Sequence, residues 1–159
     1  MRLRLSLLHL DNASGSDASH SPDDQKTREF ALKKILITGT AGFIGFHLAK
    51  LLLEEGSVVH GYDGMTDYYD VAVKQRRHAI LLQNPNFAAT EGMLEDQDLF
   101  DRVADEFAPD VIIHLAAQAD VRVSVARPAY DAEVNVLGSL NVLEGARAAG
   151  ARKVVFAPS

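Results

Sequence analysis

The 159-residue sequence contains no cysteine. Disulfide bonds, thiolate nucleophiles and zinc–thiolate sites are therefore excluded, and we expect a cytoplasmic protein because a reducing compartment is compatible with this composition. No apolar run approaches the roughly 20 residues that a membrane-spanning helix needs, so no membrane association is expected. The six histidines are scattered without close pairs at metal-ligand spacing, and we expect no metal site.

Positive charge is also scarce: the sequence has 16 lysines and arginines against 22 aspartates and glutamates, which gives a net charge of −6. Such a chain has no general basic surface, so nucleic acid is not an expected partner. Its length is sufficient for one domain with its own core. A hydrophobic content of 47% and a charged content of 24% are typical of a soluble globular protein.

The first 33 residues differ from the rest of the chain. Residues 11–29 are rich in serine and aspartate and contain no large apolar side chain, which is typical of disorder. In residues 1–10 the leucines are interrupted by Ser6 and His9, so the apolar core of a signal peptide is missing. We predict a disordered extension at 1–33 and a folded domain at 34–159.

The sequence KILITGTAGFIG at residues 34–45 organises this domain. An apolar strand-like run is followed by Gly39, Gly42 and Gly45, and then by apolar residues at helical spacing. In a dinucleotide-binding turn the first glycine permits a tight bend, the second lets a pyrophosphate approach the backbone, and the third lets the helix lie close to the strand. The spacing GxxGxxG in this context predicts such a turn.

Asp63 lies 18 residues after Gly45, at the end of a second predicted strand. This is the position expected for a carboxylate that accepts hydrogen bonds from the adenosine ribose hydroxyls. No arginine follows immediately to receive a 2′-phosphate, so NAD is the expected cofactor. The alternative is a turn aspartate beside Gly64.

Strand-like and helix-like segments alternate from residue 34 to the end of the sequence. We expect strands at 35–38, 58–62, 87–90, 111–115 and 154–157, and helices at 43–55, 71–82, 95–107 and 134–149. The alternation predicts an α/β fold, a Rossmann-type parallel sheet with helices on both faces. Right-handed crossovers favour the strand order 3-2-1-4-5.

Residues 34–159 resemble the extended short-chain dehydrogenase/reductases, and within them the NAD-dependent epimerase/dehydratase family. The matching stretches occur in the family's order: TGTAGFIG at 38–45, HLAAQA at 114–119 and NVLGSLNVLE at 135–144. DYYD at 67–70 and QADVRVS at 118–124 resemble the UDP-glucuronate 4-epimerase group. The resemblance implies an enzyme that inverts C4 of a UDP-sugar by transient hydride transfer to NAD.

The resemblance also implies roles for individual residues. The expected cofactor contacts are Phe43 and Ile44 at the pyrophosphate, Leu94 beside the adenine, and Leu115, Ala116 and Ala117 at the nicotinamide ribose. Asn135 is expected to be structural. Ser159 falls where the family carries the catalytic serine or threonine that bonds the sugar hydroxyl.

The family's catalytic base, the tyrosine of a Tyr-x-x-x-Lys pair, is expected beyond the fifth strand. A lysine at the required distance from Tyr69 would be residue 73, which is Val73. The chain therefore resembles the amino-terminal part of such an enzyme, with the sheet truncated after its fifth strand and without the sugar-binding lobe. We expect it to be inactive by itself and to belong to a homodimer when full length.

Three departures from the family pattern keep other functions open. Met93 stands where the family often has an aspartate near the adenine, so that contact is expected to be lost. Asp120 replaces a glycine, and Val123 a tyrosine, on the loop expected to face the sugar. A nucleotide-sugar dehydratase or dehydrogenase of the same fold remains an alternative, as does a non-catalytic dinucleotide-binding module.

Overall fold

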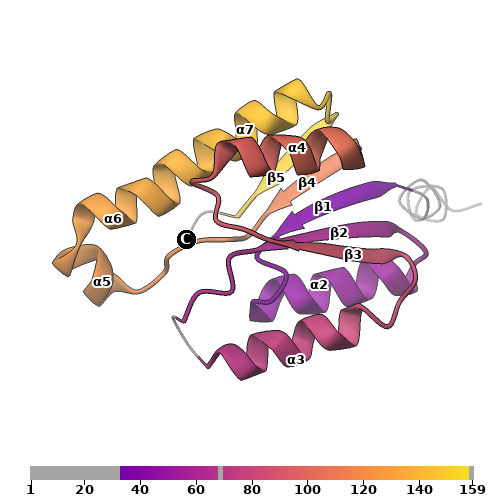
Figure 1. Ribbon diagram of the computed structural model, residues 1–159, viewed down its shortest axis with the longest axis horizontal. Coiled ribbons are helices and arrows are strands. Elements are labelled where there is room, and N and C mark those ends of the chain that lie inside the picture. The colour runs from indigo at the N-terminus through magenta and orange to yellow at the C-terminus, as the bar shows by residue number, and fades with distance from the viewer. Residues whose placement is uncertain (1–32, 68–69, 158–159) are drawn as a thin grey trace, which may run out of the picture.

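The computed structural model describes residues 33–67 and 70–157. Its centre is a parallel sheet of five strands in the order β3-β2-β1-β4-β5 (Figure 1). The strands are β1 (Lys34–Thr38), β2 (Val58–Asp63), β3 (Phe87–Glu91), β4 (Val111–His114) and β5 (Lys153–Phe156). The predicted fold class and strand order are confirmed. Of the predicted extension at 1–33, all but Lys33 lies outside the described residues.

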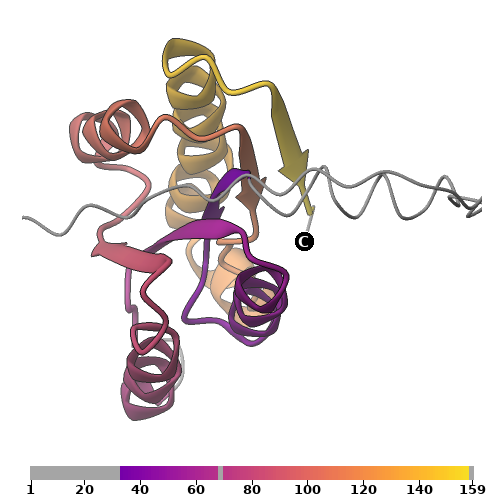
Figure 2. The same ribbon diagram turned by 90° about the vertical axis from the view of Figure 1, so that its right-hand side faces the viewer.

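Helices cover both faces of the sheet, as Figures 1 and 2 show. The helices are α2 (Phe43–Glu54), α3 (Val71–Leu81), α4 (Gln97–Phe107), α5 (Val121–Ala126), α6 (Pro128–Ala132), the π-helical η1 (Glu133–Leu137) and α7 (Gly138–Ala148). α2 and α3 lie against one face, and α4 and α7 against the other. Each connection between strands that are consecutive in the sequence thus contributes at least one helix to a layer.

The two faces of β1 build two separate cores, because side chains alternate along a strand. Ile35 and Ile37 pack under α2 and α3 with partners that include Leu52. Leu36 points to the opposite face and packs with Phe100 of α4 and other residues of that layer. Ile35, Leu36 and Ile37 are fully buried, and such burial stabilises the fold by roughly 1.5–3 kcal/mol per residue. This double burial explains why the strand is apolar without interruption.

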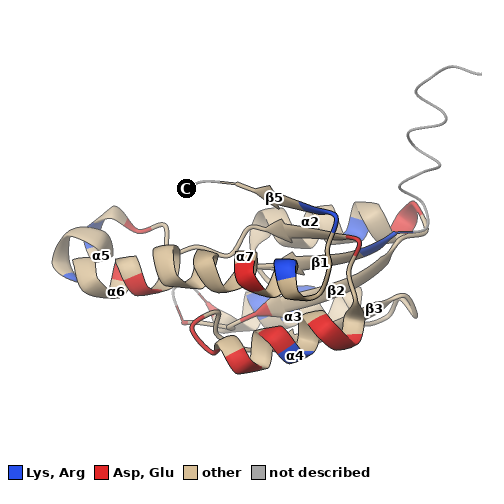
Figure 3. Cartoon of the chain, turned by 90° about the horizontal axis from the view of Figure 1, so that it is seen from above, with Lys and Arg blue, Asp and Glu red and all other residues tan. Residues whose placement is uncertain are grey.

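Helix α4 is amphipathic. Phe100, Val103 and Ala104 face the core, while Asp98 and Asp105 are exposed. Figure 3 shows the acidic residues along this helix in red. The exposed aspartates keep the outer face of this layer in contact with water. Within the described ranges, no helix has the length and apolar character needed to cross a membrane.

The segment after β4 differs most from the sequence prediction. We expected a loop around Asp120 and Val123 and a helix starting at residue 134. Residues 121–126 instead form α5, which Asp120 caps, and the long helical rod begins at Pro128 with α6. Proline is favoured at the first position of a helix because its fixed φ suits the helix and its missing N–H costs no hydrogen bond there. The rod continues through η1 into α7 (Figure 1).

Candidate functional site

The glycine-rich turn between β1 and α2 requires each glycine for a different reason. Gly39 has a φ of +81°, and a Cβ there would lie 2.9 Å from the backbone nitrogen of Ala116. A Cβ at Gly45 would collide with the carbonyl oxygen of Gly39, so only glycine lets α2 approach this closely. Gly42 has an ordinary φ of −66° and precedes the first residue of α2. Its missing side chain leaves the turn open on the ligand side.

The first turn of α2 presents backbone N–H groups without intrahelical acceptors, as every helix start does. Phe43 and Ile44 begin the helix, and their side chains are 66% and 67% exposed. A helix N-terminus carries a partial positive charge that favours a phosphate. The turn therefore has the shape and the donors of an anion site.

Asp63 ends β2 and is almost fully buried, with 7% of its surface exposed. Its Oδ2 accepts a hydrogen bond from the backbone N–H of Ala41 at 2.9 Å, and its Oδ1 accepts one from Met65 N–H at 2.9 Å. A carboxylate offers about four acceptor positions, so two remain for ligand hydroxyl groups. Asp63 thus fixes the glycine-rich turn and still has capacity to bind a ligand.

These elements surround a cavity of about 340 Å³ at the carboxyl end of the sheet. Seven residues proposed from the sequence line it: Gly39, Gly42, Asp63, Leu94, Leu115, Ala116 and Ala117. Phe43, Ile44 and Gly45 adjoin Gly42 at the start of α2 but do not line the cavity. Ser159, the expected catalytic residue, lies outside the described residues.

The structure adds cavity residues that sequence reasoning missed. At one end Lys74 donates from Nζ to the carbonyl oxygen of Thr66 at 2.7 Å. At the other end Arg127 lies with its guanidinium carbon 4.4 Å from the centre of the Tyr130 ring. No local pattern marks these residues, because α3, α5 and α6 reach the cavity only in the folded chain. Within residues 33–67 and 70–157, no three potential metal ligands gather in one place.

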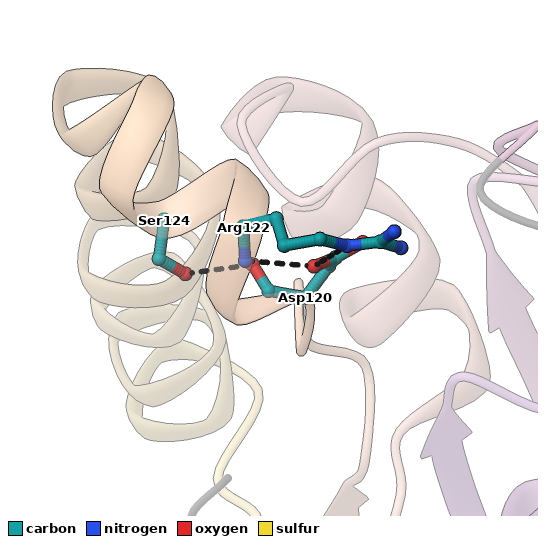
Figure 4. A network of polar contacts seen from close by, with 3 residues as sticks. All are labelled: Asp120, Arg122 and Ser124. Atoms are coloured by element: carbon teal, nitrogen blue, oxygen red, sulfur yellow. Dashed lines mark hydrogen bonds and ion pairs between the residues drawn. The ribbon is translucent and has the colours of Figure 1, made fainter.

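Asp120 organises the start of α5 (Figure 4). Its Oδ1 accepts the backbone N–H of Arg122 at 2.8 Å, and its Oδ2 lies 3.0 Å from the Arg122 guanidinium. The side-chain hydrogen bond to Arg122 is the main cause that lowers the pKa of Asp120. The hydroxyl group of Ser124 donates to the Asp120 carbonyl oxygen at 3.1 Å. Val123 of this helix lines the cavity, whereas Asp120 does not.

A buried chain of hydrogen bonds runs from β1 to η1 through His114. Thr38 Oγ1 lies 2.7 Å from His114 Nδ1, and His114 Nε2 lies 3.0 Å from Ser139 Oγ. Ser139 uses its own proton to bond the carbonyl oxygen of Asn135 at 2.5 Å. The proton between His114 and Ser139 must therefore be on Nε2, and Thr38 donates to Nδ1. This arrangement requires a neutral imidazole, and burial lowers the pKa of His114 to about 4.

The same contacts fix the strand end that lines the cavity. Thr38 Oγ1 accepts the backbone N–H groups of Leu115 and Ala116, each at 3.2 Å. Asn135 bonds Gln118 twice, accepting its N–H at 2.8 Å and donating to its carbonyl oxygen at 2.9 Å. These two bonds hold the segment after β4 against η1, which is a structural role of the kind expected for Asn135.

Comparison with known proteins places this site in a family. The sequence profile of one protein family, described as GDP-mannose 4,6 dehydratase, matches residues 36–159. A curated Rhizobium meliloti protein named "Probable UDP-glucuronate 4-epimerase" is 53% identical over 124 residues, which are 78% of this chain and 36% of that protein. The chain spans between 26% and 40% of the length of the curated relatives compared, and 36% of the Rhizobium meliloti protein.

Two solved structures show the same arrangement of elements. The UDP-glucose 4-epimerase of Thermus thermophilus, in complex with NAD, is 37% identical with a TM-score of 0.66, covering 79% of this chain and 37% of that one. The UDP-glucose 4-epimerase of Thermotoga maritima, with UDP-glucose, is 36% identical with a TM-score of 0.66, covering 77% and 37%. The chain therefore belongs to the GDP-mannose 4,6 dehydratase family, whose profile it matches from residue 36 to residue 159.

Proposed function

We propose that residues 34–159 form the NAD-binding domain of a nucleotide-sugar 4-epimerase of the UDP-glucuronate or UDP-glucose type. One observation carries the proposal: the glycine-rich turn, Asp63 and the strand end Leu115–Ala117 line a single cavity at the carboxyl end of the sheet. That is where open α/β sheets bind dinucleotides. The similarity to epimerases, one of which is solved with NAD, supports the choice of ligand.

The residues present fit NAD in three places. Gly42 leaves the backbone open to the pyrophosphate, and the N–H groups of Phe43 and Ile44 are available to its oxygens. Asp63 keeps two acceptor positions for the adenosine ribose hydroxyls after its bonds to Ala41 and Met65. The small side chains of Ala116 and Ala117 leave space on the cavity wall for the nicotinamide ribose.

When bound, NAD supplies a nicotinamide ring that can accept a hydride from C4 of the sugar. This chain's residues hold the cofactor and, through Thr38, fix the strand end against which it would lie. Ser159 would bond the reacting hydroxyl group. The 159 residues do not supply the tyrosine base, since Thr66, Ala72, Val73 and Val134 lie four positions after the four tyrosines.

The test is a hybrid enzyme. Residues 36–159 replace the corresponding segment of the Rhizobium meliloti relative, and the hybrid is assayed with UDP-glucuronate and, separately, UDP-glucose. We expect conversion of at least one sugar to its C4 epimer, dependent on NAD. A folded hybrid that binds NAD without converting either sugar would contradict the epimerase proposal, and failure to bind NAD would contradict the cofactor proposal as well. The unmodified relative is the control.

A dehydratase is the second candidate, because the matching family profile is described as GDP-mannose 4,6 dehydratase. Both reactions begin with oxidation at C4, so the reaction products must decide between them. Epimerisation returns a sugar of unchanged mass, whereas dehydration removes one water. Mass spectrometry of the hybrid's products, with GDP-mannose added as a third substrate, separates the two reactions.

We also propose that the full-length protein is a homodimer. Leu137, Leu140 and Leu143, at the end of η1 and on α7, are 43–53% exposed in these 159 residues, and such an apolar surface is covered either by the rest of the full-length protein or by a second copy. Light scattering at several protein concentrations measures the assembly state. Leu140→Glu should shift the protein to a monomer if this surface forms the interface.

A further inference from the structure

Two buried side-chain oxygens have no hydrogen-bond partner within residues 33–67 and 70–157: Glu95 Oε2 and Asp101 Oδ1. Asp101 lies under α7, where its Oδ1 would be 2.8 Å from a Cβ at Gly145. Glu95 instead lines the candidate cofactor cavity. A buried acceptor without a donor is costly and unusual in native proteins. At a cavity wall, a ligand donor is a direct explanation for it.

Glu95 belongs to the loop after β3, and this loop lies beside Asp63. The backbone N–H of Gly92 donates to the Asp63 carbonyl oxygen at 3.1 Å. The sulfur of Met93 lies 2.5 Å from the position that a Cβ on Gly64 would take, so the loop packs directly against the residue after Asp63. If Asp63 binds the adenosine ribose, the base attached to that ribose must lie against this wall.

The wall offers mostly apolar surface to a base. Met93 and Leu94 contribute a thioether and an alkyl side chain to the cavity. Their carbonyl oxygens already accept protein donors: Tyr62 O–H donates to Met93 at 3.1 Å, and Asn141 Nδ2 donates to Leu94 at 2.8 Å. Glu95 Oε2 is therefore a buried acceptor on this wall that has no donor among the described residues.

We propose that Glu95 is the residue that selects adenine, by accepting a hydrogen bond from the exocyclic N6 amino group. The proposal rests on NAD binding as proposed above. A rotation of the Glu95 side chain toward the cavity exchanges an unpartnered buried oxygen for one that is bonded to the amine.

The experiment compares NAD with nicotinamide hypoxanthine dinucleotide, in which an oxygen replaces the N6 amino group. Isothermal titration calorimetry measures both ligands on the 159-residue chain, on Glu95→Gln and on Glu55→Gln. Glu55 is exposed and follows α2, so the second variant is a matched control. The unmodified chain and the Glu55→Gln control should bind NAD roughly 10- to 100-fold more tightly than they bind nicotinamide hypoxanthine dinucleotide, as expected for a hydrogen bond to a charged group.

In Glu95→Gln the preference should fall to within about threefold, because an amide can accept from N6 or donate to the hypoxanthine oxygen. NAD affinity should fall while hypoxanthine dinucleotide affinity rises, a pattern that a structural role for Glu95 would not produce. Equal discrimination in Glu95→Gln and the unmodified chain would overturn the proposal and leave the NAD site intact. Absence of NAD binding to the unmodified chain would overturn the proposed function itself.

Discussion

The carboxylate of Asp63 at the end of β2 and the backbone N–H of Ala41 in the glycine-rich turn are joined by a 2.9 Å hydrogen bond. This bond links the residue proposed to bind the ribose to the turn proposed to bind the pyrophosphate. A change at Asp63 should consequently affect both the stability of the turn and the binding of the cofactor.

Asp63→Ala should weaken NAD binding by about 1.5–3 kcal/mol, the usual worth of hydrogen bonds to a charged group. It should also lower the free energy of unfolding by roughly 1–3 kcal/mol, because the N–H groups of Ala41 and Met65 lose their acceptor. Calorimetry and urea denaturation measure the two effects. Asp105→Ala, on the exposed face of α4, is the control. Unchanged stability in Asp63→Ala would show that the turn does not depend on this bond.

The same carboxylate should make the protein prefer NAD to NADP. A 2′-phosphate on the adenosine ribose would meet the negative charge of Asp63, whereas a hydroxyl group can donate to it. Calorimetry with both cofactors on the same preparation tests the preference. Equal or tighter binding of NADP would contradict the role assigned to Asp63.

Gly42→Val should abolish measurable NAD binding while the sheet stays folded. The φ of −66° at Gly42 is open to any residue, and a Cβ would lie 3.0 Å from the Gly39 carbonyl oxygen, a contact that small shifts can relieve. The valine side chain would occupy the space for the pyrophosphate. Circular dichroism should show native secondary structure, and calorimetry should detect no heat of NAD binding.

Gly39→Ala provides the contrast, since its φ of +81° and a Cβ 2.9 Å from Ala116 N strain the turn itself. This variant should lose about 1–3 kcal/mol of stability. If Gly42→Val binds NAD as tightly as the unmodified chain, the phosphate site lies elsewhere.

Stability should fall as the pH drops from about 6.5 toward 4. The pKa of His114 is about 4 in the folded chain and 6.5 in the unfolded chain, so below pH 6.5 protons bind preferentially to the unfolded chain. His114 contributes at most roughly 3 kcal/mol to the free energy of unfolding. This contribution is present above pH 6.5 and is lost as the pH falls to 4. Burial also lowers the pKa of His60 and of His78, so both act in the same direction.

Urea denaturation of the unmodified chain and of His114→Gln at several pH values isolates the contribution of His114 to the pH dependence of stability. The slope of the unfolding free energy against pH should be shallower in this variant, by up to about 1.4 kcal/mol per pH unit. Parallel curves for the two proteins would mean that burial does not hold the imidazole of His114 neutral.

The 159-residue chain should show no epimerase turnover, even with NAD bound. Loss of a general base alone typically costs about 10²–10⁴-fold, and no Tyr-x-x-x-Lys occurs in this sequence. An assay with UDP-glucuronate and UDP-glucose over many hours measures the residual rate. Turnover comparable to that of the Rhizobium meliloti relative would show that another group takes the proton.

Local patterns in the sequence determined the sheet and its turn. Ile35, Leu36 and Ile37 are apolar in succession because the strand is buried on both faces, and that pattern needs no knowledge of its partners. The glycines at 39, 42 and 45 were predictable because each meets a backbone requirement of the turn itself. Asp63 was predictable because the length of a βα unit sets its distance from the glycines.

The tertiary structure decided what surrounds that turn. Tyr130 and Arg127 line the cavity because the helical rod that begins at Pro128 extends past the carboxyl end of the sheet (Figure 1), and no periodicity in the sequence encodes that placement. His114 is held neutral because the fold buries its ring between Thr38 and Ser139, which are 76 and 25 residues away and bond its two nitrogens. Glu95 became a candidate only when the fold left its Oε2 buried without a donor. Such features depend on which distant residues meet, and that is settled by packing of the whole chain and not by any one segment.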